Sequence, residues 1–161
     1  MHLLKNCFQR EVYQTPRGGA SHHHVILSLY GKGANVRDWL HVEDNCRAIE
    51  IVARRGALGE AYNIGANDER RNIDVARGIV KLLGKKRYLI KFVPDTPGHD
   101  RRYALNCRKI RALGWKPDAA FEEGLDRTVK WYVQNEEWWR KIKERSTEFK
   151  PFYDVYYRDR K

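Results

Sequence analysis

The chain has no apolar run close to the roughly 20 residues that a membrane helix needs. Residues 1–10 also lack the uninterrupted apolar stretch of a secretory signal. The chain has 161 residues, of which 42% are hydrophobic. This suits one globular domain with a core and leaves little room for a second. We therefore expect a soluble, cytoplasmic, single-domain protein.

Cysteine is scarce. Cys7, Cys46 and Cys107 lie far apart without a CxxC spacing, which favours neither a disulfide framework nor a zinc site. The three adjacent histidines at 22–24 cannot all face one metal from a regular strand or helix, and no carboxylate or cysteine stands nearby at ligand spacing. We expect reduced thiols and no metal site.

Familiar catalytic motifs are also absent from the 161 residues. The sequence contains no GxSxG, no HExxH, no GxxxxGK[ST], and no GxGxxG after a strand. We therefore assign no catalytic and no cofactor-binding residues. The polar and basic residues instead fall on predicted loops and helix starts, where proteins usually hold anions.

A formal charge of +11 predicts an anionic partner, either a nucleic acid or a sugar nucleotide. The cations are spread from Lys32 to Lys161 among many acidic residues, which disfavours nucleic acid. A basic nucleic-acid-binding module remains an alternative, supported by charge and by the aromatic residues Tyr88, Tyr103, Trp115 and Trp131. The helical spacing of these aromatics favours core packing over base stacking.

The pattern of apolar residues predicts an α+β fold in which helices outnumber strands. Residues 1–29 show no clear periodicity and form an irregular segment, whereas residues 30–161 form one domain. A helix over 43–55 carries an apolar stripe at helical spacing and ends at Gly56. The stripe comprises Val42, Cys46, Ile49 and Ala53. We expect further helices over 73–83, 107–113 and 121–132, and short strands over 36–42, 61–64 and 88–93.

Three segments carry residues suited to a nucleotide. Tyr30 supplies an aromatic plane and Arg37 a guanidinium that can grip a phosphate, although Arg37 could instead pair with Asp38 or Glu43 in a surface hairpin. Asn72 could cap a helix, or hold a phosphate with the free amide hydrogens of that helix start. His99 could donate to a phosphate or sugar oxygen, or be a loop histidine without a special role.

Several motifs then identify a family. The segment YGKGANVRDWLHVED at 30–44 resembles dTDP-glucose 4,6-dehydratases, which are sugar-nucleotide enzymes of the short-chain dehydrogenase/reductase superfamily. The segments YNIG at 62–65, NID at 72–74 and PGHDRRYA at 97–104 are similar to theirs too. LGWKP at 113–117 is shared with sugar-nucleotide epimerases and decarboxylases, so the narrower PGHDRRYA run decides the choice within the superfamily.

The resemblance implies a role for each matching residue. Tyr30 would lie beside the thymine nucleoside, and Arg37 and Asn72 would hold the diphosphate of a dTDP-sugar. A loop would close over that diphosphate, formed by Asp95, Thr96, Pro97, Gly98 and His99. The family usually has an arginine where Thr96 stands, which puts one phosphate contact in doubt.

The family is an NAD-dependent lyase, and its NAD-binding Rossmann domain and catalytic residues precede the segment that matches here. The resemblance thus implies the C-terminal substrate-binding portion with the Rossmann core missing. We expect NAD in the full-length family, no cofactor on this chain alone, and no turnover by it, so whether it is an enzyme stays open. Self-association or docking with a Rossmann-containing chain is expected. Assembly with a full-length dehydratase is a further alternative.

Overall fold

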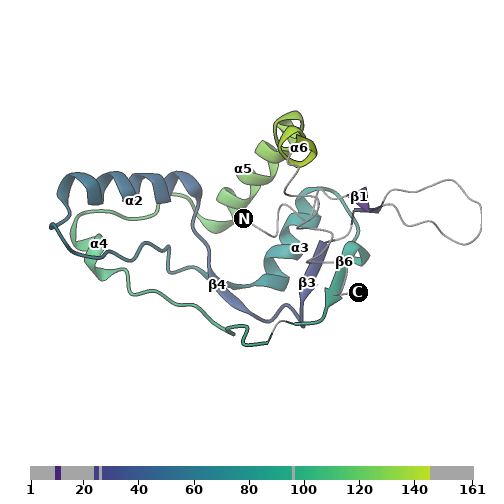
Figure 1. Cartoon of the computed structure of the whole chain (residues 1–161), viewed down its shortest axis with the longest axis horizontal. Helices are drawn as coiled ribbons and strands as arrows, with labels where there is room; N and C mark the ends of the chain where they lie inside the picture. Colours follow the sequence, from purple (N-terminus) through teal and green to yellow (C-terminus); the bar gives the residue numbers. More distant parts are fainter. Residues whose placement is uncertain (1–9, 12–23, 26, 96, 146–161) are drawn as a thin grey trace, which may run out of the picture.

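The computed structural model describes residues 10–11, 24–25, 27–95 and 97–145 (Figure 1). It confirms a mixture of helices and short strands. The elements are β1 Arg10–Glu11, β2 His24–Val25, β3 Leu27–Tyr30, β4 Val36–Asp38, α2 Val42–Arg55, β5 Glu69–Arg71, α3 Asn72–Leu82, the 3-10 turn η1 Arg87–Leu89, β6 Ile90–Val93, α4 Arg108–Ala112, α5 Phe121–Gln134 and α6 Glu136–Arg145. Among the described helices, none is long and apolar enough to cross a membrane.

The strands form three pairs, and two of them carry the residues of interest. β3 runs parallel to β6, in a register that sets Leu27 opposite Ile90 and Tyr30 opposite Val93. β4 runs antiparallel to β5, and the opposite side of β4 forms a parallel bridge between Val36 and Arg102. The third pair, β1 with β2, is antiparallel. β4 therefore lies between β5 and the segment that contains Arg102.

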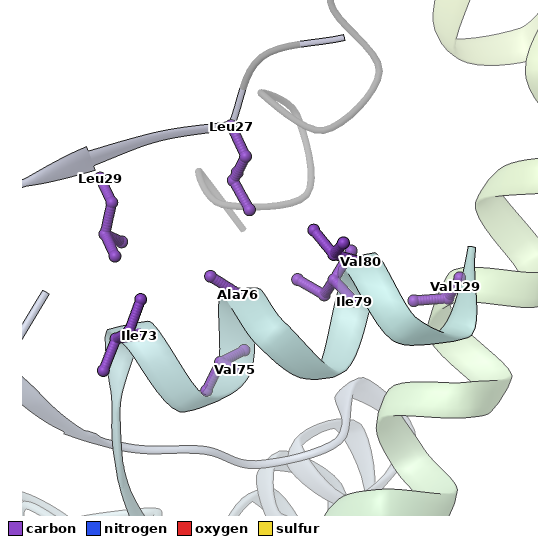
Figure 2. Close-up of a cluster of buried hydrophobic side chains, with 8 residues drawn as sticks. All are labelled: Leu27, Leu29, Ile73, Val75, Ala76, Ile79, Val80 and Val129. Carbon is purple, nitrogen blue, oxygen red and sulfur yellow. The ribbon is translucent and has the colours of Figure 1, made fainter. Parts of the chain in front are cut away.

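The first hydrophobic cluster, here called the α3 core, lies between β3, α3 and α5 (Figure 2). Figure 2 shows Leu27 and Leu29 pointing from β3 toward α3, as alternate residues of a strand must. Val129 joins them from α5. The members are Leu27, Leu29, Ile73, Val75, Ala76, Ile79, Val80 and Val129. Residues 27–29 were expected to be irregular but belong to β3. The prediction missed them because an alternation over only four residues is too short to recognise in the sequence.

The second cluster, here called the α2 core, lies between α2, α4 and the segment that follows α4. Its buried members are Ala48, Cys107, Ile110 and Trp115. Asp44 is buried beside them with 2% of its surface exposed. Its carboxylate accepts hydrogen bonds from Arg47 and from the Ala119 amide, and its backbone oxygen accepts one from Trp115 Nε1 at 3.1 Å. Figure 1 shows α2 and α4 at one end of the molecule and β3 and β6 at the other.

The apolar stripe that the sequence predicted on α2 does not face a hydrophobic core. Val42 is 64% and Ile49 54% exposed, and Cys46 is also exposed. The buried face instead carries Asp44 and Ala48. The hydrogen bonds of Asp44 lie on this side of the helix, so polar contacts with distant segments accompany the buried face.

Other elements agree more closely with the sequence. α2 ends at Arg55 before Gly56, and α4 lies within the range predicted for it. The expected strand over 61–64 does not form, and the one over 88–93 begins only at Ile90, after η1. The expected strand over 36–42 is shorter, since β4 ends at Asp38.

Candidate functional site

Parallel pairing of β3 and β6 brings the first site residues together. Both strands end at the same edge, and the Gly31 amide donates to the Val93 carbonyl at 2.9 Å. Gly31 has a φ of +55°, and a Cβ there would come within 2.8 Å of Asp95 Oδ2. A glycine is therefore needed for β3 and the loop after β6 to approach this closely.

Arg37 of β4 reaches the segment around His99. Its guanidinium donates to His99 Nε2 at 3.1 Å, to the Asp100 carbonyl at 2.9 Å and to the Val36 carbonyl at 2.7 Å. The guanidinium carbon also lies 4.3 Å from the centre of the Tyr103 ring, within cation–π range. The structure thus joins two of the predicted residues, Arg37 and His99, that are 62 positions apart.

The alternative in which Arg37 pairs with a neighbouring carboxylate was wrong for the described part of the chain. Asp38 accepts hydrogen bonds from the backbone amides of Asn67 and Asp68 at 3.1 and 3.0 Å. Glu43 lies 3.4 Å from Arg127 of α5. Both carboxylates are therefore directed to other groups.

His99 connects Arg37 to the loop after β6. Its Nδ1 lies 2.6 Å from Asp95 Oδ1. Because a guanidinium can only donate, Nε2 must accept from Arg37, which assigns the proton to Nδ1 and makes Nδ1 the donor to Asp95. The Tyr30 ring meets His99 edge-on, with ring centres 6.2 Å apart. Tyr30, Arg37, Asp95 and His99 therefore form one contiguous group.

The remaining residues of the predicted loop contribute less. Pro97 and Gly98 form an exposed turn, and Gly98 has a φ of +71°. Thr96 lies outside the described residues.

The Asn72 side chain does not cap α3, so the helix-capping alternative for this residue was wrong. It is the first residue of the helix, and Arg71 precedes it as an N-cap without a side-chain hydrogen bond. The Asn72 amide donates to the Asn35 carbonyl at 2.9 Å. Its Oδ1 is buried without a hydrogen-bond partner among the described residues. Because an amide oxygen can only accept a hydrogen bond, a donor group of a ligand, such as a hydroxyl, would satisfy it, and a phosphate oxygen would not.

Two further contacts, which were not among the predicted site residues, border the group. Arg102 donates to both oxygens of Glu69 at 2.5 and 2.7 Å, across β4, and this bond lowers the pKa of Glu69. The Tyr103 hydroxyl donates to the Asp100 carboxylate, which raises the pKa of Tyr103. All of these residues except Glu69 lie in the PGHDRRYA motif, so the motif could have identified them in the sequence.

The segment after β3 lacks the arrangement that holds a dinucleotide cofactor. Such a site needs a strand, a glycine-rich turn and then a helix whose N-terminus faces the pyrophosphate. After β3 the chain passes Gly31 and Gly33 and continues into β4 instead. No group of three or more metal-ligating side chains was found in the described ranges. The chemistry that this group offers is that of anion binding.

Known proteins are similar to part of this chain in sequence and in fold. The profile of a family described as GDP-mannose 4,6 dehydratase matches residues 13–128. The dTDP-glucose 4,6-dehydratase 1 of Escherichia coli K12 is 49% identical over 125 residues, covering 73% of this chain and 35% of that protein.

Two solved structures superpose on the chain. The dTDP-glucose 4,6-dehydratase of Bacillus anthracis in complex with NAD is 52% identical, with a TM-score of 0.67 over 71% of this chain and 37% of that one. The dTDP-glucose 4,6-dehydratase of Streptomyces venezuelae with NAD and TYD bound is 44% identical, with a TM-score of 0.67 over 70% and 35%. The chain thus spans about a third of the length of these relatives. The matches do not support the nucleic-acid-binding alternative.

Proposed function

Because the chain belongs to the GDP-mannose 4,6-dehydratase family, we propose that the group around Arg37 and His99 binds the diphosphate of a dTDP-sugar. Relatives at 43% to 49% identity are named dTDP-glucose 4,6-dehydratases, which supports this choice of nucleotide. Tyr30 and the Asp95 to His99 loop border the proposed diphosphate position, and Asn72 opens the helix beside it.

One observation carries the proposal: Arg37 forms no ion pair with a carboxylate of the described residues. Within the described residues its hydrogen bonds go only to neutral acceptors, namely two carbonyl oxygens and His99 Nε2. Three other arginines of this region are bound to carboxylates instead. These pairs are Arg70 with Asp68, Arg71 with Asp74 and Arg102 with Glu69. Arg37 is therefore a cation without a carboxylate partner whose guanidinium is already held in place by hydrogen bonds, which suits it to a ligand phosphate.

We propose dehydration only for a protein in which these residues act together with the part of the relatives that this chain does not match. Two structures of relatives are NAD complexes, so the hydride carrier would bind to that other part. The role of the present residues would be to hold and orient the diphosphate while the sugar reacts there. For the 161-residue chain alone we expect nucleotide binding without turnover.

Calorimetric titration of the 161-residue chain with dTDP tests the proposal. The Arg37→Ala variant removes a charge-assisted contact worth roughly 1.5 to 3 kcal/mol, so affinity should fall by about tenfold or more. Arg71→Ala is the matched control, since Arg71 lies on β5 opposite Val36 and is bound to Asp74. Equal losses in both variants, or none in either, would place the diphosphate elsewhere.

A further inference from the structure

Asn35 joins the two segments that carry the proposed diphosphate ligands, although neither its sequence context nor the family motif marked it as a site residue. It lies between Gly33 and β4 and is 7% exposed. Its backbone oxygen accepts the Asn72 amide at 2.9 Å, at the start of α3. Its side-chain Nδ2 donates to the Asp100 carbonyl at 3.1 Å, beside His99.

The Asp100 carbonyl accepts two hydrogen bonds, one from Asn35 and one from Arg37. It accepts from Asn35 Nδ2 at 3.1 Å and from Arg37 Nη2 at 2.9 Å, which together use its two lone pairs. The Asn35 amide therefore holds in place the oxygen that orients the guanidinium. Asp100 also follows His99 directly, so the same contact restrains the backbone that carries the imidazole.

Neighbouring backbone bonds keep Asn35 itself in position. The Gly33 carbonyl accepts the Ile73 amide at 2.9 Å, and the Val36 amide donates to the Arg101 carbonyl at 2.7 Å. Gly33 has a φ of +65°, and a Cβ there would come within 2.3 Å of Leu29. The turn before β4 is thus attached to α3 on one side and to the segment of Asp100 on the other.

We propose that Asn35 is a positioning residue for diphosphate binding, which sets Arg37 and His99 relative to the start of α3. The proposal rests on the proposed diphosphate site. Asn35 is buried and acts through the Asp100 carbonyl, so it is not a ligand of the phosphate itself. A purely structural asparagine would affect folding stability but leave the geometry of Arg37 and His99 unchanged, and this difference can be measured.

The test compares Asn35→Ala with Asn63→Ala. Asn63 Nδ2 donates to the Asn106 carbonyl at 3.3 Å, so the control removes a hydrogen bond between the same chemical groups, here at an exposed position, farther along the same segment. Two quantities are measured in each: the dissociation constant for dTDP, and the imidazole nitrogen chemical shifts of His99, assigned through their loss in His99→Gln. The nitrogen shifts report the Nδ1–H form that the contacts with Arg37 and Asp95 impose.

We expect Asn35→Ala to weaken dTDP binding about three- to tenfold, the range for one lost hydrogen bond. We also expect it to move the His99 nitrogen shifts toward an average of the two tautomers, with Asn63→Ala changing neither. Unchanged His99 shifts in Asn35→Ala would overturn the proposal. If wild-type chain binds no dTDP, the proposed function fails, while the His99 shifts still decide the positioning role. Should the alanine variant not fold, Asn35→Ser repeats both measurements, since its hydroxyl is too short to reach Asp100.

Discussion

The two hydrophobic cores of this chain are stabilised in different ways. The α3 core consists of aliphatic side chains from β3, α3 and α5 that pack against each other. The α2 core is smaller, and the buried residue Asp44 connects its helix to Ala119 through its carboxylate and to Trp115 through its backbone oxygen. The first core therefore depends on shape and apolar area, whereas the second also depends on hydrogen bonds to one polar residue.

The candidate site lies where segments anchored in the two cores meet. Leu29 is buried in the α3 core and is followed directly by Tyr30 and Gly31. Cys107 is buried in the α2 core and lies four residues beyond Tyr103, which contacts Arg37. Loss of the α3 core should displace Tyr30 and Gly31, whereas loss of the α2 core should displace Tyr103. Substitutions in each core can separate these two contributions to the stability of the site.

The largest effect is expected in the α3 core. Ile79 is fully buried, so Ile79→Ala should lower the free energy of unfolding by about 2 to 5 kcal/mol through lost burial and a residual cavity. Ile49→Ala is the matched control, because Ile49 lies on the exposed face of α2 and should change stability by about 0.5 kcal/mol or less. Urea unfolding followed by circular dichroism measures both. Similar losses would mean that the exposed face of α2 is covered in solution.

A smaller effect is expected at the polar contact of the α2 core. Asp44→Ala leaves the Ala119 amide without its acceptor and removes one of the two carboxylates bonded to Arg47, which should cost about 1 to 3 kcal/mol. Glu43→Ala, one residue away with a side chain 71% exposed, should cost about 0 to 1 kcal/mol. Amide hydrogen exchange should accelerate more in α2 than in α3. Uniform acceleration in both helices would show that the two cores unfold as one unit.

The smallest effect concerns the pair that crosses β4 between the cores. Hydrogen bonding to Arg102 lowers the pKa of Glu69 below its usual 4.5, so the pair stabilises the fold above that value. This contribution is lost as the pH falls through the lowered pKa. Glu69→Gln should therefore show a shallower decline in unfolding free energy on acidification than wild type. Glu50→Gln, which removes an exposed pair on α2, serves as control. Identical pH profiles for wild type and Glu69→Gln would exclude a stabilising role.

Local patterns in the sequence were sufficient for the helices and for the residue types of the site. Apolar spacing and the glycines at 56, 84 and 114 predicted three helices close to their observed bounds. The family motifs also indicated Arg37 and His99. These features depend on residues within a few positions of each other, where helix geometry and turn chemistry are determined.

Contacts between distant residues were decided only by the tertiary structure. The buried face of α2 carries Asp44, which bonds to Trp115 and Ala119, more than 70 positions away, and not the apolar stripe that the sequence suggested. Pairing of β3 with β6 placed Gly31 beside Asp95, and Asn35 became the link between Asn72 and Asp100. A sequence records which groups can donate or accept, but which donor meets which acceptor depends on how the whole chain packs.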